Sequence, residues 1–168
     1  MLETVFLAYA PKKLEQLAGR IAACLDTLDE EQIWGRAGGN SNAVGNLVLH
    51  LCGNVRQWIG FGVAKLPDVR MRDREFAARG GISRADLKER LAGVIAEAAG
   101  IIRSLPPERL TETVTIQGYD LTVFEAIIHV IEHFSGHTGQ IIFAAKAMTE
   151  KDFGFYNFPR KPAAEKIP

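Results

Sequence analysis

The chain has 168 residues, a length typical of one domain, and its hydrophobic and charged shares of 47% and 24% are those of an ordinary globular protein. Lysine plus arginine and aspartate plus glutamate both number 20, so the formal net charge is zero. This balance argues against general nucleic-acid binding and electrostatic docking on a membrane, because both need a basic surplus. We therefore expect a single domain over residues 1–168 with neither kind of partner.

Apolar residues recur every three or four positions from Glu3 to Leu28, which predicts a first helix with Pro11 at its true start or at a kink. The stretch 28–42 is polar and rich in glycine and asparagine, so it is predicted to be a loop from which Trp34 packs against the helices. A second helix is predicted from about Asn42 to Val63.

Three polar residues interrupt the apolar second helix at four-residue spacing: Asn46, His50 and Asn54. Burial of a polar group costs several kcal/mol unless it finds a partner, so a line of such groups needs a reason. Taken alone, His50 is expected to be a core histidine with satisfied hydrogen bonds. The histidines of the last helix, described below, favour a metal ligand instead.

The stretch 62–81 contains Pro67 and ends in two glycines, which predicts a connector. It carries four arginines interleaved with acidic residues: Arg70, Arg72, Arg74 and Arg79. The favoured interpretation is a solvated cluster of charges that pair with one another. The alternative is a loop over the mouth of a site, with arginines that hold an anionic group of a substrate.

A capping pattern at Ser83 predicts the start of a third helix, which ends before Pro106. The residue pattern then changes to that of strands. It predicts a short hairpin that closes one end of a bundle, with Thr111–Ile116 paired with Tyr119–Leu121 across a tight turn.

Thr122 and Glu125 form a capping box at the start of a fourth helix, which runs to about Met148 and is apolar on nearly every side. Such a helix is central or lies partly in a subunit interface. Gly136 and Gly139 lie inside it, each at a cost of about 1 kcal/mol relative to alanine, which close approach of a neighbouring helix or a ligand would explain.

The tail carries four aromatic residues that we expect to pack back onto the helices: Phe153, Phe155, Tyr156 and Phe158. The predicted fold class is therefore all-α, a four-helix bundle with a short β-hairpin before the last helix.

Three of the chain's four histidines lie in the last helix, at positions 129, 133 and 137. Residues four apart lie one above the other on the same helix face, so two imidazoles can turn toward one ion. We predict a metal site formed by His50, His133 and His137, whose three ligands leave an open position, as in reactive rather than structural sites. Zinc or nickel is the first expectation for a divalent ion, with manganese or iron as alternatives.

His129 lies on the same face, but each four-residue step drifts by about 40°, so it lies about 80° round from His137 and two turns away. One ion is not expected to reach it, and we assign it to a hydrogen bond that supports a ligand or the bundle. Asn54 and Gln140 are candidates for orienting the ligands, because imidazoles bound to a metal usually donate their other N–H.

Three segments are similar to the DinB-like superfamily, including a branch classed as a domain of unknown function: NLVLHLCGNVRQWI, the DREF segment at Asp73–Phe76, and HFSGHTGQIIFAAK. The similarity covers the chain from about Leu14 to Tyr156. It implies an up-down-down-up order of the helices, a divalent metal on three histidines, and often a homodimer. Matched position by position, the ligands are His50, His133 and His137. Many relatives have a further histidine just before the last ligand, where this chain has Gly136.

By this resemblance, the first functional hypothesis is a metal-dependent transferase of a low-molecular-weight thiol such as glutathione, mycothiol or bacillithiol. A thiol that enters the open position would be deprotonated by the ion and become a nucleophile at neutral pH. The arginines of residues 70–79 would then hold carboxylates of the thiol or its acceptor.

Two alternatives remain open at this point. A metal-dependent hydrolase would use water whose pKa the ion lowers from 15.7 to about 7, and it usually needs a carboxylate base. Glu125 is a cap and Glu132 points away from His133, so the base would have to be Asp120 or an acid of a loop. The other alternative is a non-catalytic metal-binding or stress-response module whose partner is another protein.

Two cysteines, Cys24 and Cys52, lie in apolar helical segments without the spacing of a CxxC pair. They predict reduced core thiols and, with an N-terminal stretch unlike a signal peptide, a cytoplasmic protein. No apolar run approaches the roughly 18 residues of a membrane span.

Overall fold

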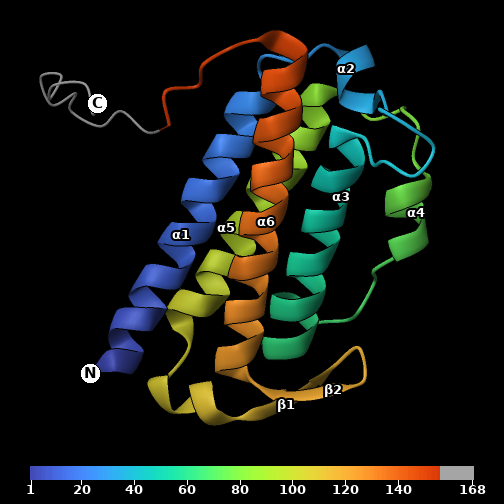
Figure 1. The fold of residues 1–168 in the computed structure, drawn as a ribbon. Coiled ribbons are helices and arrows are strands. Elements are labelled where there is room, and N and C mark those ends of the chain that lie inside the picture. Colours follow the sequence, from blue (N-terminus) through green and yellow to red (C-terminus); the bar gives the residue numbers. More distant parts are fainter. Residues whose placement is uncertain (156–168) are drawn as a thin grey trace, which may run out of the picture.

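The computed structural model describes residues 1–155 of the chain, and within them four long helices form a bundle (Figure 1). The four are α1 (Leu2–Leu25), α3 (Val44–Val55), α5 (Arg84–Ser104) and α6 (Val123–Thr149). Helices α1 and α6 run away from the end of the bundle at which the N-terminus lies, whereas α3 and α5 run toward it. The predicted up-down-down-up bundle is therefore confirmed.

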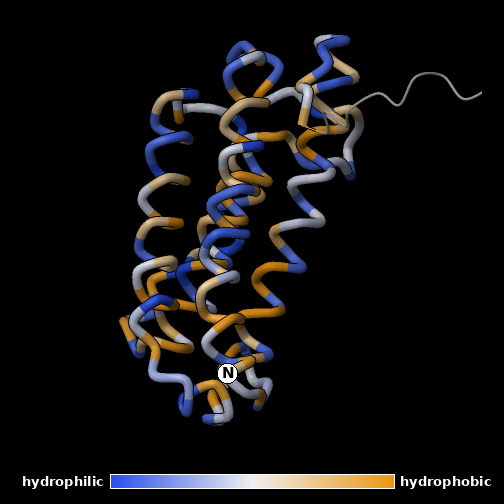
Figure 2. Tube along the Cα trace, turned by 90° about the vertical axis from the view of Figure 1, so that its left-hand side faces the viewer, coloured by the Kyte–Doolittle hydropathy of each residue, from blue (hydrophilic) through white to orange (hydrophobic). Residues whose placement is uncertain are grey.

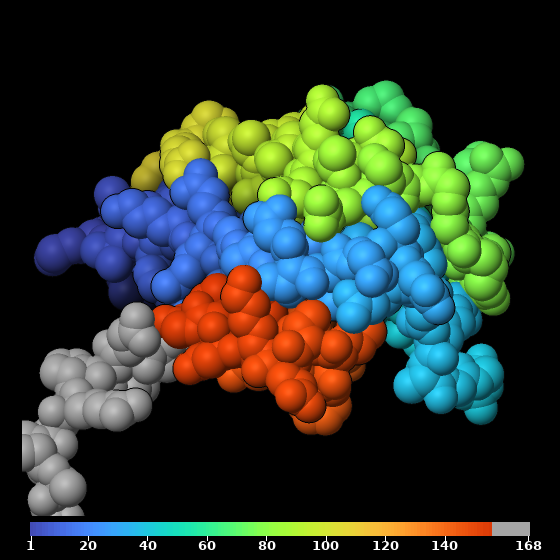
Figure 3. All heavy atoms as spheres, turned by 90° about the horizontal axis from the view of Figure 1, so that it is seen from above, coloured from blue at the N-terminus to red at the C-terminus, as the bar shows by residue number. Residues whose placement is uncertain are grey.

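The core is apolar because each long helix turns its leucine, isoleucine and valine side chains inward. Helix α1 packs against both α5 and α6, as the space-filling view shows (Figure 3). Helix α3 packs against the same two helices from the other side of the bundle. Hydrophobic and hydrophilic residues alternate along the helices (Figure 2), as expected when one face of each is buried.

Helix α1 runs through Pro11, so this proline does not mark the start of the helix, and the alternative of a kink stays a prediction. The ring of Pro11 is buried, and the packing of this face compensates for the backbone hydrogen bond that proline cannot make. The helix ends at Leu25, three residues before the predicted end. The hydroxyl of Thr27 donates to the carbonyl of Cys24 at 2.7 Å and so closes its last turn.

The second predicted helix is confirmed in extent but not in type, because α3 passes into a π-helix, η1 (Arg56–Val63). In a π-helix each carbonyl accepts from five residues on, which shifts the direction of the side chains that follow. Trp58 lies in this segment and is buried.

Two stretches predicted to lack regular structure each contain a short helix. Helix α2 (Glu30–Trp34) begins at a capping box in which the Asp29 carboxylate and the Gln32 side chain bond each other's backbone N–H. Trp34 packs against the core as predicted and donates from Nε1 to the carbonyl of Ile82 at 3.2 Å. Helix α4 (Arg72–Ala77) lies within the predicted connector, and its position decides the geometry of the site described below.

The predicted hairpin is present, with β1 (Thr113–Ile116) antiparallel to β2 (Tyr119–Thr122). It starts two residues later than expected because Pro107–Thr111 form a 3₁₀ turn, η2, before it. The intervening Gln117 and Gly118 both have positive φ, at 54° and 82°, which the tight turn requires.

Helix α6 starts at the predicted capping box of Thr122 and Glu125. A Cβ atom added at Gly136 or Gly139 would meet nothing within 4 Å, so close approach of a neighbouring helix does not explain these glycines within the described chain, and approach of a ligand stays a prediction.

Phe153 and Phe155 pack against the core, as expected of the tail, whereas Tyr156 and Phe158 lie outside the described residues. Across residues 1–155, none of the helices combines the length and the apolar character that crossing a membrane would require.

Candidate metal centre

The structure brings together the three histidines predicted as metal ligands, one from α3 and two from α6. One ring nitrogen of each of His50, His133 and His137 lies within 4.8 Å of the other two. The Nε2 atoms of His50 and His133 are 2.9 Å apart, and the ring centroids of His133 and His137 are 4.5 Å apart. The cluster forms because α3 and α6 pack side by side at the level of these residues.

His50 is buried, and its outer nitrogen is held by a buried ion pair. Its Nδ1 lies 3.0 Å from Oε2 of Glu75, and Arg70 donates to both oxygens of that carboxylate at 2.9 Å. A carboxylate only accepts hydrogen bonds, so Nδ1 carries the proton and Nε2 keeps its lone pair. That lone pair is on the side of the ring that faces His133.

Helix α4 brings Glu75 to His50, and Asn46 anchors α4 to α3. The Asn46 amide donates to the carbonyls of Glu75 at 2.8 Å and Ala78 at 3.0 Å. Gly53, one turn below His50 on α3, leaves the space for this approach, because a Cβ there would collide with the Glu75 carboxylate. The polar line of α3 is therefore explained at Asn46 and His50 by the docking of α4.

The two predicted orienting residues have different outcomes. Gln140 is confirmed, because His137 donates from Nδ1 to its Oε1 at 2.7 Å, which leaves Nε2 of His137 for a ligand. Asn54 is wrong. Its buried Oδ1 has no hydrogen-bond partner among residues 1–155, and Glu75 takes the role at His50. The sequence signal for Glu75 was the DREF segment, but nothing local showed that it would reach His50.

The electrostatics of the cluster favour neutral imidazoles at His133 and His137. Burial, together with the neighbouring histidine rings, lowers the pKa of His133 to about 4. Burial also lowers the pKa of His137, although its hydrogen bond with Gln140 acts in the opposite direction. Burial alone would raise the pKa of Glu75, but hydrogen bonds from Arg70 and His50 outweigh it, so the pKa is lowered and the carboxylate is ionised. Neutral imidazole is the form that binds metals.

His129 lies outside the cluster, and the hydrogen bond predicted for it is wrong, since it makes none within the described residues. Its ring instead stacks on Trp58, with centroids 3.8 Å apart and planes 24° apart. It also lies parallel to His133, with centroids 5.7 Å apart. The aromatic face of Trp58 covers His129, so the histidine forms one side wall of the cluster.

The arginines of residues 70–79 do not form a loop open over the cluster. The side chain of Arg70 is buried and bonds Glu75 and Gln57, so the predicted pairing within the cluster is confirmed there, although this arginine is neither solvated nor free for a substrate. Arg72, Arg74 and Arg79 are exposed, as predicted for a solvated cluster. Arg79 donates to the backbone carbonyls of Phe76 and Ala78.

The carboxylates considered for a hydrolase lie elsewhere. Glu125 caps α6, Asp120 accepts from the hydroxyl of Thr115 in the hairpin, and Glu132 is exposed. Among the described residues, no carboxylate joins the three histidines in the cluster. Residues 1–155 therefore do not place a carboxylate base beside an ion bound at this site.

Comparisons with known proteins agree with the fold. A family model described as "Protein of unknown function (DUF1572)" matches residues 2–162. The crystal structure of a DinB-like protein (YjoA) from Bacillus subtilis is similar with a TM-score of 0.69 and 13% sequence identity, over 88% of this chain and 97% of that one. No curated protein matches the chain. The predicted DinB-like architecture is thus confirmed, and at this identity the likeness concerns the fold alone.

Proposed function

The chain belongs to the DUF1572 family of proteins of unknown function, and we propose that it binds one divalent metal ion through His50, His133 and His137 and transfers a low-molecular-weight thiol. The observation that carries the proposal is the convergence of three imidazole nitrogens from two helices. Hydrogen bonds at Nδ1 of His50 and of His137 leave the lone pair of Nε2 on each ring free to coordinate a metal ion.

The donor set fits a metal ion on chemical grounds. Three neutral imidazoles suit zinc, nickel and iron, and the low pKa of His133 means that no proton has to leave this ring at neutral pH. The carboxylate partner of His50 orients that ring and fixes its tautomer, as is common around bound metals. We propose zinc or nickel first, with manganese or iron as alternatives.

Each residue of the site has a separate task in this proposal. Glu75 and Gln140 fix the tautomers of His50 and His137 through hydrogen bonds at Nδ1. His133 and His137 are only partly buried, so a small molecule can reach the centre from the surface of α6. When bound, the ion supplies Lewis-acid activation that lowers the pKa of a thiol.

Thiol transfer is favoured over hydrolysis by the lack of a carboxylate in the described cluster. A thiol is acidified by the ion itself and needs no further base, whereas hydrolases of this kind usually place a carboxylate beside the ion. Glu75 contacts the cluster through His50, but its carboxylate is paired with Arg70 and lies at Nδ1, on the far side of the His50 ring.

The metal site is tested by elemental analysis of the purified protein beside His50→Ala and His137→Ala, with His129→Ala as the matched control from the same helix. We expect about one divalent ion per wild-type chain, a large loss in the first two variants and retention in the control. Full occupancy in His50→Ala would refute the site.

The reaction is tested by offering the metal-loaded protein an electrophilic aryl halide with glutathione, mycothiol or bacillithiol in turn. We expect thioether formation that stops on chelation and in His137→Ala. Turnover of an ester or amide without any thiol would select hydrolysis instead. Inertness toward both, with the metal bound, would leave a non-catalytic module that acts through another protein.

A further inference from the structure

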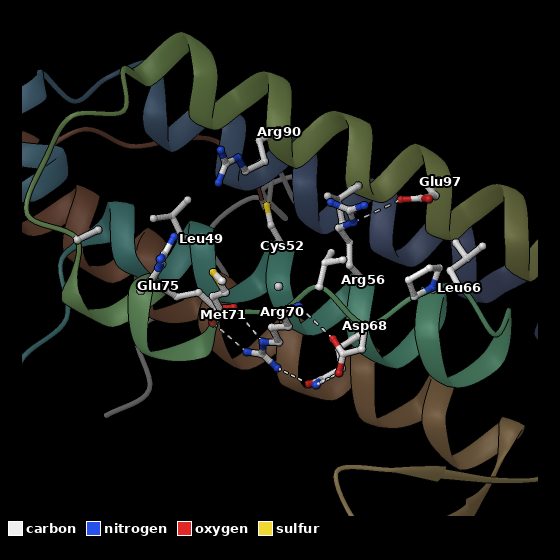
Figure 4. Close-up of a pocket in the computed structure, with 18 of the residues that line it drawn as sticks. Leu49, Cys52, Arg56, Leu66, Asp68, Arg70, Met71, Glu75, Arg90 and Glu97 are labelled. Atoms are coloured by element: carbon white, nitrogen blue, oxygen red, sulfur yellow. Dashed lines mark hydrogen bonds and ion pairs between the residues drawn. The ribbon is translucent and has the colours of Figure 1, made fainter.

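A pocket of about 470 Å³ lies on the α5 side of α3, opposite the side from which α6 supplies its histidines (Figure 4). It is lined by α3, η1, α4, α5 and the chain between η1 and α4. Its volume is in the range of small-molecule sites, about 300–1,000 Å³. None of the three clustered histidines lines it, so it is separate from the candidate metal centre.

Much of the pocket wall is apolar: Leu49, Leu66, Pro67, Val69, Met71 and Val94. Leu66 and Val69 are 40% and 65% exposed, and covering such apolar side chains with an apolar ligand is favourable because it removes their surface from water. This part of the pocket therefore favours a hydrocarbon group.

Most charges that line the pocket already have partners. Arg70 is paired with Glu75, and Arg56 lies 3.8 Å from Glu97. Asp68 accepts from the Gln57 amide at 2.8 Å and from the backbone N–H of Arg70 at 3.0 Å. Its charge is thus held by neutral donors within the pocket wall.

Two cationic side chains of the pocket have no partner among residues 1–155. They belong to Arg74 of α4 and Arg90 of α5, and neither guanidinium group makes an ion pair or a hydrogen bond with a described residue. We propose that this pocket is a second binding site, which takes a small amphipathic anion whose carboxylate is bound by Arg74 and Arg90 and whose hydrocarbon part covers the apolar wall.

The pocket and the histidine cluster share one wall. Arg70 and Glu75 line the pocket, and Glu75 accepts from Nδ1 of His50, so a bound anion lies beside the pair that orients this ring. It does not reach Nε2, which faces His133 on the other side of the ring. The second site is thus placed to act on the centre through the orientation of His50, and its existence does not depend on which metal is bound.

The test is calorimetric titration of the purified protein with octanoate, beside octan-1-ol and octylamine as probes of equal chain length. We expect one saturable octanoate site per chain, weaker binding of the alcohol and none of the amine. Arg74→Ala and Arg90→Ala should each weaken octanoate binding about tenfold, the usual effect of losing a charged hydrogen bond. Amide NMR shifts should map to the pocket residues.

Two further variants serve as controls. Arg103→Ala removes an exposed arginine of α5, the helix that carries Arg90; it is paired with Glu15 outside the pocket, and this variant should bind octanoate as wild type does. Leu66→Glu adds a repelling charge at a partly exposed position of the pocket wall and should abolish binding, with circular dichroism as the check on folding. Repeating the titration after chelation separates this site from the metal centre.

The proposal is overturned if octanoate binding does not saturate, if the alcohol or the amine binds as tightly as octanoate, or if Arg74→Ala and Arg90→Ala both keep wild-type affinity.

Discussion

The two halves of the histidine cluster are held in different ways. His50 on α3 is 5% exposed, and its outer nitrogen is bonded to an ionised carboxylate that Arg70 grips with two hydrogen bonds. On α6, His137 has only the neutral Gln140, and no described residue bonds Nδ1 of His133. The α3 half is therefore fixed before any ligand arrives, whereas the α6 half is free to adjust.

The difference has a structural origin. The α6 histidines lie at four-residue spacing, which the helix itself makes adjacent. His50 has no such neighbour, and its ring is fixed by α4, which Asn46 anchors through two backbone carbonyls. A preorganised ligand on one side and adaptable ligands on the other suit a centre whose open position takes a second molecule.

The largest expected effect is on stability and comes from removing the guanidinium group that pairs with Glu75. Arg70→Met should lower the free energy of unfolding by about 3–5 kcal/mol, because it strands a buried carboxylate. Arg103→Ala, which breaks the exposed pair with Glu15, should cost less than about 1 kcal/mol. Urea unfolding of both variants measures the contrast. Equal small losses would show that the α3 half is not held by its ion pair.

The next effect concerns metal affinity. Glu75→Gln should weaken zinc binding about 10–100-fold, since it removes the charged partner of a metal-binding imidazole. Gln140→Ala should weaken it less, because the α6 half relies on a neutral hydrogen bond. Competition with a chromogenic chelator gives both affinities, with circular dichroism as the check on folding. A greater loss in Gln140→Ala would reverse the comparison.

The α6 half should also show itself in the pH dependence of the metal-free protein. The pKa of His133 is about 4 in the folded chain and 6.5 without the fold, so the unfolded chain binds its proton first as pH falls. The contribution of His133 to the free energy of unfolding is therefore fully present above about pH 6.5 and is lost as the pH falls toward 4. Because the ring is half buried and screened by solvent, we expect a loss of about 1–2 kcal/mol.

Urea midpoints at several pH values, recorded with chelator present, measure this loss. His133→Asn should flatten the profile, although His129 and His137 contribute in the same direction because burial lowers their pKa values too. An unchanged profile in the variant would contradict the assignment.

The smallest effect tests the open surface of α6. Gly139→Ala should raise stability by about 0.5–1 kcal/mol, because its Cβ would meet nothing within 4 Å and alanine favours the helix. The same change at Gly53 should destabilise the protein, since it collides with the Glu75 carboxylate. Thermal unfolding separates the two. A stabilised Gly53→Ala would mean that Glu75 does not need its observed position.

Local chemistry was sufficient to predict the long helices, the cap at Thr122, the hairpin and the partner of His137. Each depends on residues a few positions apart, whose relative directions the helix or the turn sets. Gln140 was therefore predictable, because it lies one turn from His137 on the same helix.

The rest depended on how the helices dock. Asn54 has the right spacing on α3, yet Glu75, 25 residues further along the chain than His50, occupies the outer nitrogen. The stack of His129 on Trp58 and the pocket lined by Arg74 and Arg90 likewise join segments far apart in sequence. The sequence by itself determined which histidines share a helix face, because helical periodicity is local. Only the tertiary structure decided which charged groups surround them, because a side chain from a distant segment reaches its partner only once the packing of the core has brought the helices together.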